Sequence, residues 1–229
     1  MLTPEEWQIV ALSLRVSLLA VAGTLPIAFG LAWVLARGRF AGKILLDAAV
    51  HLPLVLPPVV IGWLLLIGFG RTGPIGGFLY DTFGITLIFR WTGAALASAV
   101  MALPLMVRAI RLSIEAIDRR LEGAARTLGA SPMHAFWTVS LPLCLPGVLA
   151  AIVLGFARSI GEFGATITFV SNIPGETQTL PIAVYAALQV PGGEGVVTRL
   201  AIVSILLSLA ALVVSELLAR RSRGAPHVL

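Results

Sequence analysis

The chain alternates between long apolar stretches and short clusters of polar residues. Five stretches are predicted to cross a membrane, at residues 16–36, 44–69, 91–107, 139–157 and 200–218. About 20 apolar residues suffice to span the hydrocarbon core as a helix. The apolar residues are continuous and do not alternate with polar ones, which favours helices over the strands of a barrel. The pattern therefore predicts an all-α integral membrane protein with five transmembrane helices.

Composition supports this class. Of 229 residues, 58% are hydrophobic and only 12% are charged, whereas soluble domains carry about 25% charged residues. A soluble globule of this size could not bury so much apolar surface. We find no repeat and no soluble domain, so residues 1–229 are predicted to form one membrane domain, with its transmembrane region at about 11–219.

The basic residues predict how the chain crosses the membrane. Eleven of the 16 lie on one face of the five-span layout. Because loops rich in Lys and Arg stay inside, the N-terminus is predicted outside and the C-terminus in the cytoplasm. The net charge of +5 does not indicate nucleic-acid binding, since these residues form short clusters between spans. The clusters are Arg37, Arg39 and Lys43; Arg108, Arg111, Arg119, Arg120 and Arg126; and Arg220, Arg221 and Arg223.

A short apolar segment at residues 179–189 stands apart from the five spans. It is predicted as a helix at the outer mouth, too short to cross the membrane by itself. A count of six spans that includes it is the alternative.

The predicted cytoplasmic loop at residues 117–132 shows the pattern of two short helices joined by a turn. Asp118 suits an N-cap, Gly129 a left-handed C-cap, and Ser131-Pro132 a second helix start. Such a helix either docks into a partner's groove or lies on lipid, where its arginines would meet phosphates. Its apolar stripe would consist of Ile117, Leu121, Ala124 and Leu128.

This loop resembles the "EAA" loop of type I ABC importer permeases. Ala124-Ala125, Gly129 and Leu141-Pro142 keep the spacing of that pattern, with Val139 in place of its Ile. One departure is that Gly123 stands where the pattern has Glu, and Glu122 precedes it by one place. The resemblance implies a segment that docks on an ATPase. Its residues are Leu121, Glu122, Gly123, Ala124, Ala125, Arg126, Thr127, Leu128, Gly129, Ala130 and Ser131.

The resemblance extends over most of the chain. Residues 51–60 (HLPLVLPPVV), 125–132 (ARTLGASP) and 156–177 look like the bacterial molybdate importer permeases. This implies a homodimer in the bacterial inner membrane, two cytoplasmic ATPase subunits and a periplasmic protein that delivers molybdate or tungstate. No cofactor or metal would be bound by this chain, and ATP and Mg would be bound by the ATPase.

No nucleotide motif is found in the chain itself. Gly42-Lys43 lacks the Ser or Thr that follows in a Walker A sequence. The GxGxxG match at Gly68, Gly70 and Gly73 leaves a predicted span and does not follow a strand. The chain is therefore predicted to be a transport subunit and not an enzyme, with ATP hydrolysis in a partner.

A polar segment at the end of the fourth span is the candidate pathway or gate. Charged residues within spans usually face an interior cavity, but Arg158 and Glu162 could equally form an i,i+4 pair. Hydroxyls nearby could donate to an anion. The candidates are Arg158, Ser159, Glu162, Thr166 and Thr168.

Prolines in the second span are predicted to bend it, since proline removes a helix hydrogen bond. Pro53, Pro57 and Pro58 are candidate hinge residues, or they only set the shape of the helix. His51 in the same span could relay protons, although the preferred interpretation is a polar residue near the inner interface.

Three other functions remain as alternatives. The first is a type I ABC permease for another solute, such as sulfate. The second is an ion-coupled secondary transporter, which would require inverted repeats and intramembrane acids. The third is a membrane enzyme, for which the sequence offers no His-Glu-x-x-His or Gly-x-Ser-x-Gly motif.

Overall fold

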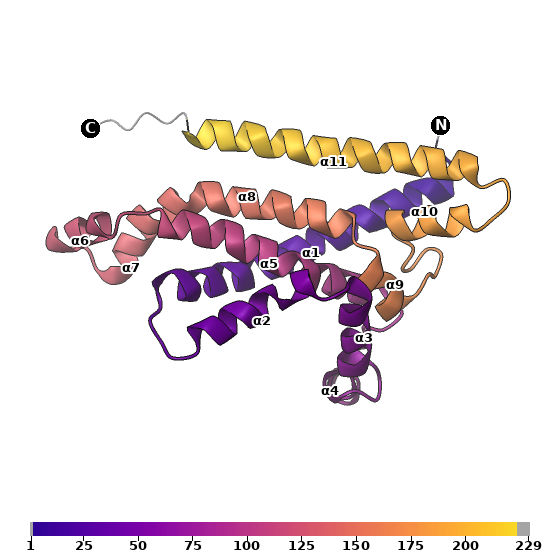
Figure 1. Cartoon of the computed structure of the whole chain (residues 1–229), viewed down its shortest axis with the longest axis horizontal. Helices are drawn as coiled ribbons and strands as arrows, with labels where there is room; N and C mark the ends of the chain where they lie inside the picture. Colours follow the sequence, from indigo (N-terminus) through magenta and orange to yellow (C-terminus); the bar gives the residue numbers. More distant parts are fainter. Residues whose placement is uncertain (1, 224–229) are drawn as a thin grey trace.

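A computed structural model describes residues 2–223, and this part of the chain is helical without strands. Four long helices lie side by side along the longest axis (Figure 1). They are long and apolar enough to cross a membrane, and a bent pair of shorter helices forms a fifth span if counted as one. The long helices are α1 (Pro4–Arg37), α5 (Trp91–Glu115), α8 (Leu141–Ile160) and α11 (Glu194–Arg223).

Helix α1 begins at Pro4, well before the predicted start at residue 16. Thr3 and Glu6 form a reciprocal capping box, which satisfies backbone N–H groups at the helix start. Glu6 is buried and pairs with Arg199 of α11, with 2.8 Å between the carboxylate oxygen and the guanidinium nitrogen. This long-range pair stabilises a polar first turn that lies before the predicted first span.

The predicted second span, residues 44–69, is not one helix. It consists of α2 (Lys43–Val55) and α3 (Pro58–Phe69), which meet at an angle of 114°. Leu56 and Pro57 have extended backbone, and Pro58 occupies the first turn of α3. Two consecutive prolines leave this point without backbone donors, which explains the break. Pro53 is accommodated inside α2.

The predicted fourth span begins earlier than residue 139. A continuous helical stretch covers Pro132–Ile160. It comprises α7 (Pro132–Ala135), a π-helical turn (Phe136–Ser140) and α8. The loop at residues 117–132 therefore leads into the span without a break.

Short helices lie at both ends of the long ones. Helices α4 (Pro74–Phe83), α9 (Gly164–Val170) and α10 (Leu180–Leu188) fill the predicted outer loops. Helix α10 has 9 residues, too few to cross a membrane. The fold is thus consistent with five spans and a short helix at the outer mouth.

Helix α5 lies at the centre and contacts α1, α2, α8 and α9. Glycines let α8 approach it closely. A Cβ on Gly147 would lie 2.2 Å from the Cβ of Ser113, and one on Gly155 would lie 2.6 Å from the sulfur of Met106. Small residues at such contacts are typical of helix packing in membranes.

The two ends of the bundle differ. The α6–α7 segment and the end of α11 lie at one end, and the N-terminus and α10 lie at the other (Figure 1). This arrangement matches the alternate sides that the basic clusters predict. Which end faces the cytoplasm stays a prediction. The side chains of Arg220, Arg221 and Arg223, and residues 224–229 of the predicted domain, lie outside the described part.

Candidate functional site

The loop between α5 and α8 forms the predicted helix, turn and second helix start. Asp118 caps α6 (Arg119–Thr127) by accepting a hydrogen bond of 2.9 Å from the backbone N–H of Arg120. Gly129 has φ +93°, which L-residues rarely adopt. Ser131 caps α7 by accepting from the N–H of His134 at 3.2 Å. These are local signals, so the boundaries of both helices are encoded by the residues of the loop itself.

The apolar stripe predicted for this loop divides between the core and the surface. Ile117 is buried with the core, whereas Leu121 is 49% exposed and Leu128 is 89% exposed. Helix α6 contains no buried residue. Met133 and Trp137, just after the loop, are also exposed. Large apolar side chains displayed in this way are typical of a contact site for a partner or for lipid.

Glu122 points from α6 toward the long helices. One of its carboxylate oxygens accepts hydrogen bonds of 2.8 Å from the Arg37 guanidinium and 2.8 Å from the Ser140 hydroxyl. The sequence offered Arg37 only as a topology signal and did not single out Ser140. The one available hint was that Glu122 stands one place before the position at which the family pattern has Glu.

The predicted pathway segment is the break between α8 and α9. Arg158 and Glu162 form the i,i+4 ion pair that was the alternative interpretation. The Glu162 carboxylate is 1% exposed and also accepts from the backbone N–H of Ala165 at 2.9 Å. The guanidinium of Arg158 therefore balances the negative charge of the Glu162 carboxylate at the start of α9. A role of these residues in lining or gating the pathway stays a prediction.

The three predicted hydroxyl groups have different surroundings. Thr168 donates to the carbonyl oxygen of Gly164 at 2.8 Å. Ser159 and Thr166 are buried, and their hydroxyl oxygens have no hydrogen-bond partner among the described residues. An unpaired buried hydroxyl costs about 1–3 kcal/mol, so these two are the hydroxyls free to bind another group.

The bend in the second span packs on this same segment (Figure 1). A Cβ on Gly164 would lie 2.8 Å from the Cβ of Pro58. A Cβ on Gly62 would lie 2.6 Å from the carbonyl oxygen of Ala165. The structure therefore brings together two predicted sites, the candidate hinge and the candidate pathway, which are about a hundred residues apart in the sequence.

A second charged cluster lies between α2 and α5. Arg111 bridges Asp47 at 3.0 Å and Glu115 at 2.8 Å, and the His51 ring nitrogen lies 3.2 Å from the Asp47 carboxylate. These residues and Arg108 line a pocket of about 320 Å³. Two carboxylates balance the two arginines, so the pocket presents no excess of positive charge to an anion. His51 is thus placed as a polar residue beside an ion pair.

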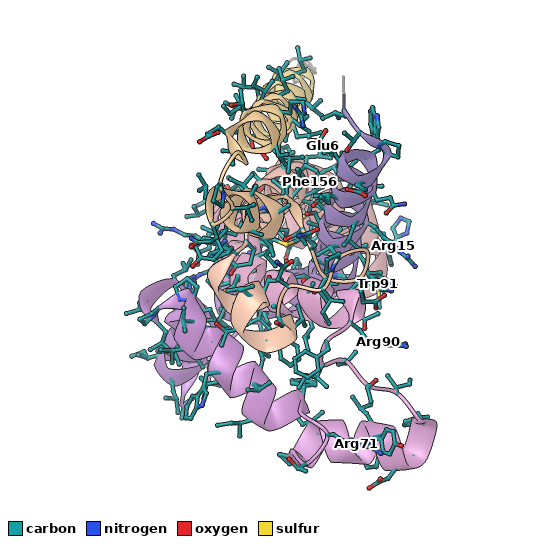
Figure 2. All side chains as sticks on the ribbon, turned by 90° about the vertical axis from the view of Figure 1, so that its right-hand side faces the viewer. Glu6, Arg15, Arg71, Arg90, Trp91 and Phe156 are labelled. Atoms are coloured by element: carbon teal, nitrogen blue, oxygen red, sulfur yellow. The ribbon has the colours of Figure 1, made fainter. Side chains whose placement is uncertain are left out.

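The end that carries the N-terminus displays several arginines (Figure 2). The Arg15 guanidinium lies 3.7 Å from the centre of the Trp91 ring. Arg71 donates to the Tyr80 hydroxyl at 2.7 Å, away from the bundle and beside α4. Arg90 is exposed as well. Two of these arginines, Arg15 and Arg71, are thus held against aromatic rings.

The bundle of long apolar helices and the bent second span define a multi-pass membrane protein. Residues 25–224 match the family of binding-protein-dependent transport system inner membrane components, and the chain belongs to this family. It is a multi-pass protein of the bacterial inner membrane.

Two relatives and one solved structure place it more narrowly. The chain is 61% identical to the molybdenum transport system permease protein ModB of Escherichia coli, over 97% of each chain. It is 40% identical to the sulfate transport system permease protein CysT of Salmonella typhimurium, over 80% of this chain and 66% of the relative. A chain of a bacterial alginate ABC transporter, solved with its alginate-bound periplasmic protein, has the same fold. Its TM-score is 0.74 at 15% identity, over 96% of this chain and 80% of that chain.

Proposed function

We propose that this chain is the membrane-spanning subunit of an ATP-driven importer of molybdate, with tungstate as the analogous oxyanion. The observation that carries the proposal is the 61% identity to ModB over almost the whole length of both chains. The geometry of the α6–α7 loop supports the ATP-driven part, because the loop displays a capped, exposed helix at one end of the bundle.

The energy source would be a pair of ATPase subunits. Leu121–Ser131 would dock on them, with Leu128 as an apolar anchor because it is 89% exposed. ATP and Mg would be bound there and not by this chain. A second copy of the chain would complete the pathway, since a two-fold dimer is the simplest closed assembly. A periplasmic molybdate-binding protein would dock at the end that displays Arg15, Arg71 and Arg90.

Transport would follow alternating access. Closure of the ATPase pair would move the docked loops, and the helices beyond would rock to open the pathway outward. The contact between Pro58 and Gly164 would then transfer bending of the second span to the Arg158–Thr168 segment. Solute release and ATP hydrolysis would restore the inward-facing state.

Sulfate transport is the second candidate function. The 40% identity to CysT supports it, but that match is lower and covers less of both chains. Sulfate and molybdate are both tetrahedral dianions, so the fold and charges of the permease do not separate them. The binding protein would supply the discrimination.

The test is uptake by proteoliposomes that contain the permease and its ATPase, with the binding protein outside. We expect labelled molybdate to enter only with ATP inside, and excess tungstate to compete far better than excess sulfate. Uptake without any ATPase would instead indicate a secondary transporter. Preferential uptake of sulfate would reject the molybdate assignment and keep the importer class.

A further inference from the structure

A single oxygen of Glu122 joins three elements at the loop end of the bundle. It accepts from Arg37, the last residue of α1, at 2.8 Å. It also accepts from Ser140, the last residue of the π-helical turn that leads into α8, at 2.8 Å. A carboxylate with a cationic partner forms the stronger class of hydrogen bond. Glu122 therefore ties α6 to the inner ends of two spans.

This contact is shielded although α6 itself is exposed. The side chains of Arg37 and Glu122 are 14% and 28% exposed, and Ser140 is buried. Within residues 2–223, no other side chain of α6 makes a hydrogen bond or ion pair to a long helix. The carboxylate of Glu122 is thus turned toward the membrane domain and away from the surface that Leu128 displays.

Aromatic rings extend the contact back to the π-helical turn. The Arg37 guanidinium lies 5.8 Å from the centre of the Trp33 ring on the preceding turn of α1. Trp33 meets Phe136 edge to face at 5.0 Å between ring centres. The path Glu122–Arg37–Trp33–Phe136 therefore returns to the same turn that contains Ser140, so that these side chains form one packed unit.

We infer that Glu122 is a positioning residue that transmits movement of α6 to α1 and α8. Its carboxylate would then not contact the ATPase. The inference rests on the proposed function. A rigid connection is needed at this point because, apart from the Glu122 contacts, α6 packs mainly on α7 and the π-helical turn. Without Glu122, movement of α6 would be absorbed by the loop on either side.

The experiment measures transport and hydrolysis together in proteoliposomes with the ATPase and binding protein. For Glu122→Gln and Arg37→Gln, we expect the molybdate moved per ATP hydrolysed to fall about tenfold, as for one lost charge-assisted hydrogen bond. The amount of ATPase that co-purifies should not change. The double variant Arg37→Glu with Glu122→Arg should recover most of the coupling, because an arginine at 122 can donate both to the new carboxylate and to Ser140.

Glu5→Gln is the matched control. It makes the same chemical change at an exposed carboxylate at the other end of α1, with no ion pair to a described residue. Loss of the ATPase from Glu122→Gln would show that this carboxylate docks the partner, and would overturn the inference. Unchanged coupling in Glu122→Gln would also overturn it.

A second measurement separates this inference from the identity of the solute. Spin labels at Arg119→Cys on α6 and Val34→Cys on α1 report whether the two helices move together when nucleotide binds. We expect one constant distance in the otherwise unchanged protein and two distances when Glu122→Gln is added. A distance that already changes with Glu122 intact would overturn the inference, even in a complex that moves another anion.

Discussion

Among the described residues, Glu6 and Glu162 are buried and Glu122 is half-buried, and each of these three carboxylates pairs with an arginine. The side chains of Glu6, Glu122 and Glu162 are 4%, 28% and 1% exposed, and their partners are Arg199, Arg37 and Arg158. Each carboxylate accepts at least one further hydrogen bond. Removing one member of a buried pair typically costs about 3–5 kcal/mol, because the other charge is left without a partner. The two long-range pairs, Glu6–Arg199 and Arg37–Glu122, therefore help to fix which helix ends meet.

The contact at Gly164 provides a prediction about the pathway segment. Gly164→Ala would place a methyl group 2.8 Å from the Cβ of Pro58, and overpacking of this kind costs about 1–3 kcal/mol. We expect a lower thermal unfolding temperature in detergent and reduced uptake. Gly161→Ala is the matched control, since its Cβ would meet only Ala157 of its own helix at 3.7 Å. Equal unfolding temperatures for the two variants would contradict this packing argument.

Of these three ion pairs, only the one between neighbouring turns of a helix was predictable from the sequence. Arg158 and Glu162 are four residues apart, so helical periodicity predicts their contact. Glu6 and Arg199 are 193 residues apart, and Arg37 and Glu122 are 85 apart. Such partners depend on which helices become neighbours, and one sequence without homologues contains no signal for that.

At the scale of elements, the exposed α6–α7 segment is the part whose conformation is determined by its own residues. Its caps at Asp118 and Ser131 and its positive-φ turn at Gly129 all follow local rules. Its surroundings are those of a docking element, with Leu128 almost fully exposed. A segment that keeps its own conformation can present the same surface to a partner while Glu122 ties it to α1 and α8.

Docking through this element can be tested directly. Leu128→Asp places a charge where the proposed ATPase contact is apolar, and we expect little or no ATPase to co-purify. Because the leucine is 89% exposed, the isolated permease should keep its thermal stability. Phe40→Asp is the control, as Phe40 is exposed at the same end of the bundle in the turn between α1 and α2. Retention of the ATPase by Leu128→Asp would argue that α6 lies on lipid.

The broken second span shows where prediction at this scale stops. Consecutive prolines at Pro57 and Pro58 predict a bend, and a bend is present. The two prolines do not by themselves determine the angle of 114° between α2 and α3. The direction of α3 follows from its packing on α9 through Gly62 and Gly164, which is a tertiary contact.

At the scale of the whole molecule, the five-span count and the class of protein were predictable from hydropathy. Lipid requires that backbone groups bond within a helix, so apolar length is a direct signal. The start of α1 was harder to predict, because its polar first turn depends on an ion pair with the distant Arg199. The family resemblance rested on the spacing of the loop that ends at Pro142 and on residues 51–60 and 156–177, and the comparisons confirm it.

The predicted orientation can be measured by cysteine accessibility in a Cys144→Ser background. Asn172→Cys lies in an exposed loop beside α9, and Arg39→Cys lies in the exposed turn between α1 and α2. With the N-terminus outside, we expect an impermeant maleimide to label position 172 in intact spheroplasts and position 39 only after permeabilisation. The reverse result would invert the topology and reject docking of α6 on a cytoplasmic ATPase.

The π-helical turn Phe136–Ser140 has a consequence for the evolution of this loop. A π-helical turn holds one residue more than a regular turn, and each residue of an α-helix corresponds to about 100° of rotation. Loss of that residue would rotate the Met133 side of α7 away from its present direction while α8 stayed in place. We therefore expect insertions and deletions at 136–140 to be selected against, because they would turn the loop away from its present direction relative to α8.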